Sequence, residues 1–172
     1  MNKQLLDDLG FFLAHSAHLE RAAAERLYEL ASMMKAHNND ELHSLFLALA
    51  RFSVDHVNEV EAICRQHSLP DLKPWDYQWP PANAPETIPC DQVNHLMTPR
   101  EALSVVIKVE QSAEAFYRSV WLQSCHERIR DYAEEFAAEE HQHAVAARRM
   151  LSRLDAAEES DRAGDAEPPA KS

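Results

Sequence analysis

Two side chains near the end of the chain have the spacing of ligands that bind one metal ion. Glu140 and His143 are three residues apart in a segment rich in helix-forming residues, so both would project from one face of a helix. Glu20, His56 and Glu110 interrupt the apolar stripes of three other segments. A buried carboxylate is costly unless it is paired or binds a metal. Three carboxylates and two imidazoles form a ligand set for iron, manganese or zinc.

Four long helices would carry these residues. The chain has 172 residues and only two glycines, and its nine prolines lie in the middle of the chain or close to its end. The two proline-free segments are rich in Ala, Leu, Glu and Arg, which favour helices. Sequences typical of helix starts follow Asn38, Thr98 and Ser124. We therefore predict helices near residues 3–37, 40–67, 99–123 and 125–156.

The connections between these helices predict how they are arranged. Short turns join the first helix to the second and the third to the fourth, which makes each pair antiparallel. Between the pairs, residues 68–98 are rich in proline and aromatic residues and are numerous enough to run the length of the bundle. This topology resembles that of ferritin-like proteins. We expect an all-α, antiparallel four-helix bundle over residues 1–157 with this long crossover, followed by a disordered tail at 158–172.

The five candidate ligands would lie at similar heights in such a bundle. Residues of an antiparallel helix pair that are equally far from the connecting turn lie side by side. Counted from their turns, Glu20 and His56 are each 18 residues away, and Glu110 and Glu140 are 14 and 16 residues away. The sequence therefore predicts one layer of polar side chains within each pair.

The candidate ligands lie in four segments: HLERAAAERLYELAS, LFLALARFSVDHVNEVEAI, VEQSAEAFYRSV and EEFAAEEHQHAVAARRML. In this order, over about residues 5–155, the segments resemble the rubrerythrin-like family of ferritin-like di-iron proteins. The resemblance implies a non-haem di-iron centre, with manganese or zinc as other possible metals, that reacts with peroxide or dioxygen. It also implies a separate electron donor and a homodimer. The ligands that it implies are Glu20, His56, Glu110, Glu140 and His143.

The sequence departs from the family's pattern at Ser53. Aligning His56 with His143 places Ser53 where a second bridging carboxylate is expected, and Asp55 lies about 200° around the helix from that position. Ala113 likewise stands where rubrerythrins often carry a glutamate. Three alternatives follow: two irons with one bridge fewer, no metal at all, or one metal held by Glu110, Glu140 and His143.

Other classes of function follow if the metal has been lost. A metal-poor ferritin-like bundle would act by binding a partner protein or by dimerising. A ferritin-type storage cage agrees less well with the sequence, which shows no short fifth helix. The net charge of −12 argues against nucleic acid and anionic membranes as partners. No apolar run approaches the roughly 20 residues that span a bilayer, and the first residues do not form a secretory signal. We therefore expect a cytoplasmic protein.

The remaining chemistry-bearing residues have more ordinary interpretations. The three cysteines form no C-x-x-C pair, which excludes a rubredoxin-type module and predicts reduced thiols. His15 and His18 precede Glu20 by about one turn, and we expect them at the surface or around the ligands. Tyr28 and Tyr117 are expected in the core. Packing roles are expected for Trp75, Trp79 and Trp121.

Overall fold

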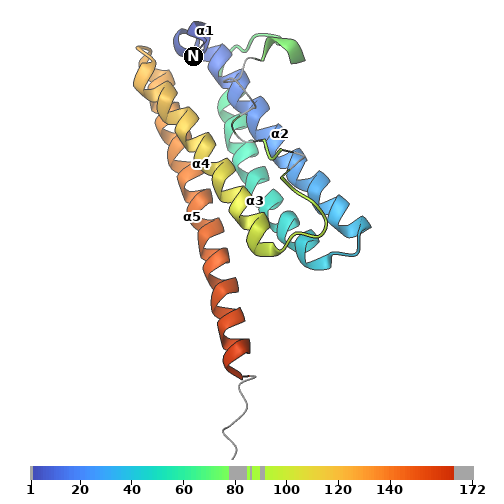
Figure 1. Ribbon diagram of the computed structural model, residues 1–172. Helices are drawn as coiled ribbons and strands as arrows, with labels where there is room; N and C mark the ends of the chain where they lie inside the picture. The colour runs from blue at the N-terminus through green and yellow to red at the C-terminus, as the bar shows by residue number, and fades with distance from the viewer. Residues whose placement is uncertain (1, 78–84, 86, 90–91, 165–172) are drawn as a thin grey trace, which may run out of the picture.

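All elements in the described part of the chain are helical. The computed structural model describes residues 2–164 except 78–84, 86 and 90–91, and side chains up to residue 157. The all-α fold class is therefore confirmed. In chain order (Figure 1) the elements are α1 (Lys3–Asp7), α2 (Leu9–Ala36), α3 (Asp40–Cys64), the 3₁₀ helix η1 (Pro74–Asp76), α4 (Pro99–Gln123) and α5 (Glu127–Gly164).

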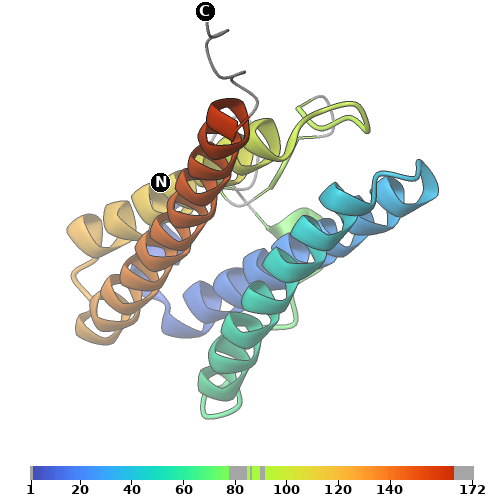
Figure 2. The ribbon, with the colours of Figure 1, turned by 90° about the horizontal axis from the view of Figure 1, so that it is seen from below.

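The long helices form two antiparallel hairpins. Helix α2 packs along α3, and α4 packs along α5. Figures 1 and 2 show the hairpins lying side by side at an angle, with α5 extending beyond the other helices towards its C-terminal end. None of the described helices is long and apolar enough to cross a membrane.

The helix starts follow from local capping. Thr98 and Glu101 form a capping box at the start of α4, with Pro99 at the first helical position, as the sequence predicts. Asn39 caps α3 by accepting a hydrogen bond from the backbone N–H of Leu42 at 3.0 Å. The preceding turn places Asn38 at φ 57°, a left-handed conformation that asparagine tolerates better than most residues.

The predicted helices differ most from the structure at three points. The expected helix at 3–37 is divided at Asp8, whose backbone is extended and whose carboxylate accepts from the N–H of Phe11 at 3.0 Å. Asp8 therefore acts as the N-cap of a new helix. Helix α3 ends at Cys64 rather than at residue 67. Helix α5 continues to Gly164, past the expected end at residue 156, while residues 165–172 lie outside the described part of the chain.

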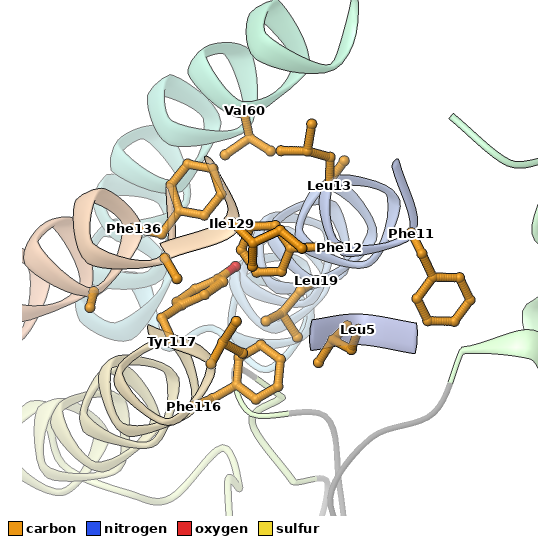
Figure 3. Packing of buried hydrophobic residues seen from close by; sticks show 14 of the residues in the cluster. Leu5, Phe11, Phe12, Leu13, Leu19, Val60, Phe116, Tyr117, Ile129 and Phe136 are labelled. Atoms are coloured by element: carbon orange, nitrogen blue, oxygen red, sulfur yellow. The ribbon is translucent and has the colours of Figure 1, made fainter. Parts of the chain in front are cut away.

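The apolar core of the described residues consists of two clusters, and both hairpins contribute to each of them. One lies near the amino-terminal end of α2, where Phe12, Tyr117 and Phe136 come from three helices and face one another (Figure 3). The rings of Tyr117 and Phe136 have centroids 5.4 Å apart, and Phe12 and Phe136 are stacked at 6.1 Å. The second cluster lies towards the turn between α2 and α3 and includes Phe46 and Leu103. Polar side chains placed between the clusters are therefore shielded from water.

The predicted tyrosine positions are half correct. Tyr117 is fully buried, but Tyr28 is 40 % exposed. Tyr28 follows Leu27 on α2, and Leu27 and Leu30 take the inward-facing positions of this stretch. The tyrosine is therefore turned outward by helical periodicity.

The aromatic side chains of the crossover pack differently from the prediction. Trp75 is 79 % exposed, so its predicted packing role is wrong, whereas Trp121 packs against the first cluster. Tyr77 does contact α2, where it stacks on His18 with ring centroids 3.9 Å apart and meets His15 edge-on at 5.0 Å. Trp79 lies outside the described residues.

The two described cysteines are free thiols. Cys64 is buried and Cys125 is exposed. Cys90 lies outside the described residues.

Replacing Gly10 with alanine should destabilise the fold. An alanine methyl at this position would lie 2.6 Å from the backbone carbonyl oxygen of Ser68, where the crossover begins. Alanine normally stabilises a helix relative to glycine by about 1 kcal/mol, whereas overpacking costs about 1–3 kcal/mol. We expect Gly10→Ala to lower the free energy of unfolding by about 1 kcal/mol in urea titrations. A more stable variant would contradict the close approach of these segments.

Candidate metal centre

The structure brings all five candidate ligands together between the two core clusters. Glu20 comes from α2, His56 from α3, Glu110 from α4, and Glu140 and His143 from adjacent turns of α5. Glu20 and His56 are each 3 % exposed and Glu140 is 1 % exposed. The side chains of Glu110 and His143 are more accessible, at 15 % and 28 %.

These side chains form two groups that can each hold a metal ion. In one group, ligand atoms of Glu20, His56 and Glu140 lie within 4.8 Å of one another. In the other, the same holds for Glu110, Glu140 and His143. Glu140 belongs to both groups, so the arrangement has the form of two adjacent sites that share one carboxylate.

The two oxygen atoms of Glu140 face different groups. Its Oε1 lies 3.9 Å from Nε2 of His56, whereas its Oε2 lies 3.5 Å from Nδ1 of His143. Nδ1 of His143 also lies 3.9 Å from Oε2 of Glu110. A carboxylate with this placement can bridge two cations, one on each oxygen.

Polar atoms in this layer lack the partners that a protein core normally provides. Oε1 of Glu140 and Nε2 of His56 are buried without a hydrogen-bond partner among the described residues. Nε2 of His56 lies 3.2 Å from Oε1 of Glu20, but the two atoms are not aligned for a hydrogen bond. The same Glu20 oxygen accepts a hydrogen bond from the hydroxyl of Tyr117 at 2.9 Å. Unpartnered buried polar atoms are rare in native proteins. A cation between Glu20, His56 and Glu140 would satisfy them, so these residues fit a metal.

The electrostatics of the layer also favour a cation. Burial, together with the charge of Glu140, raises the pKa of Glu110 well above its usual value. Burial and the charge of Glu20 raise the pKa of Glu140 to about 8. Burial alone would lower the pKa of His56, but the carboxylates of Glu139 and Glu20 outweigh it and raise that pKa to about 11. In the metal-free protein, protons therefore take the place of metal charge.

The place of the expected second bridging carboxylate is a small cavity. Ser53 lines it together with Ala23 and Glu110, and its volume of about 20 Å³ is enough for roughly one water molecule. The Ser53 hydroxyl donates to the backbone carbonyl of Leu49 at 3.4 Å. No other carboxylate takes this role among the described residues of α3, since Asp55 is exposed.

Helix α4 supplies one carboxylate to the layer. Ala113, which stands where the family resemblance places a second glutamate, is fully buried. Glu114 points elsewhere, because its carboxylate pairs with Arg118 at 2.9 Å and with His141 at 3.2 Å. With Ser53 and Ala113 in place of glutamates, the inner layer of the described residues has three carboxylates: Glu20, Glu110 and Glu140.

Two residues near the centre were missed by the sequence analysis. Glu59 and Glu139 form a third group with His56 at the outer side of the centre, along an open pocket of about 280 Å³. Oε2 of Glu139 lies 2.7 Å from Nδ1 of His56. His56 and Glu59 are three residues apart, like Glu140 and His143, and this spacing could have indicated Glu59 from the sequence.

His15 and His18 do not join the centre. His15 is 1 % exposed, and its Nδ1 contacts the backbone carbonyl of Phe11 at 2.9 Å. Burial lowers the pKa of both histidines. Both rings contact the crossover residue Tyr77, and the ring of His15 also contacts Phe11, so both histidines help to hold the crossover on α2.

Two packed helical hairpins with a shared Glu/His layer between them define a ferritin-like protein. No model of a known protein family matches the chain, and no curated protein matches it. A solved structure does match: an uncharacterized conserved protein from Magnetospirillum magnetotacticum MS-1, with 36 % sequence identity and a TM-score of 0.64. The match covers 84 % of this chain and 94 % of the other. The chain belongs to the family of that protein.

Stabilisation by metal should increase between pH 6 and pH 8. Because the pKa of Glu140 is raised from 4.5 to about 8, the metal-free protein loses stability as pH rises through this range. The raised pKa of His56 lowers the stability in the same way above pH 6.5. A metal must displace these protons, so its affinity rises over the same range. An increase in affinity of at least tenfold corresponds to about 1.4 kcal/mol, or roughly 3–6 °C in melting temperature.

The measurement is the rise in melting temperature on adding Mn²⁺, by scanning calorimetry at the two pH values. Equal rises at both values would show that binding displaces no proton from these groups.

Proposed function

We propose that the protein is a non-haem di-metal protein, with iron as the expected metal, and that it acts as a rubrerythrin-like oxidoreductase on peroxide or dioxygen. The observation that carries the proposal is the position of Glu140, whose two oxygens face two separate Glu/His groups. A structural network would not need a carboxylate in that position with one oxygen unpartnered. As further parts of the proposal, the protein is a cytoplasmic homodimer and receives electrons from a separate donor.

Each residue has a defined task in this proposal. Glu20, His56 and Glu140 would hold one ion, and Glu110, Glu140 and His143 would hold the second. Carboxylates stabilise the ferric state, and a pair of irons can supply two electrons to peroxide or dioxygen.

The surrounding residues prepare the site for that chemistry. The hydroxyl of Tyr117 donates to Glu20 and keeps one carboxylate oxygen oriented. Phe136 contacts the ring of His56 edge-on, with centroids 5.9 Å apart, and shields it from water. The cavity at Ser53 gives a water-sized molecule a place beside Glu110.

Metal stoichiometry is the direct test of the two-site arrangement. The wild-type chain, loaded with ferrous iron without oxygen, should bind about two irons by elemental analysis. Glu140→Ala should lose both ions because it removes the shared ligand. Glu20→Gln and Glu110→Gln should each weaken one ion and leave the other. Arg118→Ala, on the outer face of α4, is the control and should bind two. Iron near zero in the wild type would refute the proposal.

Reactivity is tested separately from binding. The ferrous protein should be oxidised by peroxide faster than free ferrous iron at the same concentration, as followed by stopped-flow absorbance. The same experiment with dioxygen identifies the preferred oxidant. A loaded protein that reacts with neither oxidant faster than free iron would remove the oxidoreductase part and leave metal binding intact.

A metal-poor bundle that binds a partner protein is the second candidate. The cavity at Ser53 favours it, because a carboxylate is missing where a di-iron protein would use one. In that case added metal would leave the melting temperature unchanged, since a ligand that binds only the native state must raise it.

A further inference from the structure

His56 presents its two ring nitrogens to different environments. Nε2 faces inward, 3.2 Å from Glu20 and 3.9 Å from Glu140. Nδ1 faces outward, 2.7 Å from Oε2 of Glu139. That distance is typical of a charge-assisted pair, although the contact is not well aligned as a hydrogen bond. An imidazole that carries its proton on Nδ1 has its lone pair on Nε2, directed at the inner layer.

Glu139 reaches this position because of where it lies on α5. It directly precedes Glu140, so one helical turn supplies both a carboxylate inside the centre and one outside it. The Glu139 side chain is 26 % exposed and borders the open pocket.

The charge of the inner layer shows why an outer carboxylate matters. Two divalent cations bring four positive charges, whereas Glu20, Glu110 and Glu140 bring three negative charges and neutral histidines bring none. Ser53 stands where the fourth carboxylate is expected. An uncompensated charge in a dry core is costly. Glu139, in contact with His56, supplies the fourth negative charge.

We propose that Glu139 is a positioning residue that orients His56 towards the inner metal and replaces, from outside, the carboxylate charge missing at Ser53. This inference rests on the proposed di-metal function. Metal-binding histidines commonly donate their second nitrogen to a carboxylate, and loss of such a partner typically weakens metal affinity by 10–100-fold. Here the partner has the additional task of balancing the centre's charge.

The test uses the full-length chain titrated with Co²⁺ against a chelator without oxygen. Glu139→Gln keeps the size of the side chain and removes its charge. We expect one of the two cobalt ions to bind 10–100-fold more weakly in this variant, and the other to change less than threefold. Glu135→Gln removes a negative charge one turn earlier on α5 that acts on His56 only through space, and it should change both affinities less than threefold.

Nuclear magnetic resonance of the cobalt form separates positioning from general stabilisation. The wild type should show an exchangeable, strongly shifted signal from the Nδ1 proton of His56, because the contact with Glu139 protects it from water. The signal should be lost or displaced in Glu139→Gln and kept in Glu135→Gln. Glu139→Asp, which keeps the charge but is too short to reach Nδ1, should also displace it, with a smaller loss of affinity than Glu139→Gln.

The outcomes distinguish this inference from the proposed function. If the wild type does not bind two ions, the di-metal function itself fails. If it binds two ions and Glu139→Gln has the same affinities and spectrum, Glu139 has no positioning role. If Glu59→Gln removes a third bound ion, Glu139 and Glu59 are ligands of an outer metal, and the positioning role is overturned.

Discussion

The electrostatic cost of burying three carboxylates in one layer is the constraint on which the rest of the structure depends. Glu20 and Glu140 are almost inaccessible to water, and one oxygen of Glu140 has no hydrogen-bond partner within the part of the chain that the structure describes. Without a cation, protons must reduce the negative charge, which explains the raised pKa values of Glu110 and Glu140. A fold optimised for stability alone would fill these positions with apolar side chains. A buried Glu/His layer of this composition could hold a metal ion.

The fold provides the dry surroundings that make this constraint severe. The cluster around Phe12, Tyr117 and Phe136 closes one side of the layer, and the cluster around Phe46 and Leu103 closes the other. Each cluster takes side chains from both hairpins, so the same packing that joins the hairpins also fixes the distance between ligands on α2–α3 and those on α4–α5. The hydroxyl of Tyr117 extends this coupling, because a core residue of α4 orients a carboxylate on α2.

The sequence was sufficient for the helices and for the inner layer, and insufficient where tertiary contacts decide. Proline-free segments and the Thr98 capping box predict the helices, and breaks in apolar periodicity identify all five residues of the layer. The division at Asp8 was missed, since the apolar periodicity continues through it while its side chain caps the start of a second helix. Glu139 was missed for a different reason. Its helical position is that of a solvent-facing residue, and only the neighbouring helix α3 brings His56 within contact.

Ser53 and Glu139 are best understood together. A bridging carboxylate from α3 would contribute both a ligand and a negative charge, and the serine contributes neither. The two missing contributions are met at different places. The missing ligand leaves a cavity beside Glu110, on one side of the centre. The negative charge nearest to His56 on its outer side is that of Glu139 on α5. An outer carboxylate acts through the imidazole and leaves the inner position available to a small molecule. The proposed di-metal centre would thus keep its charge balance and gain a water-sized place beside Glu110, a combination that a second bridge would exclude.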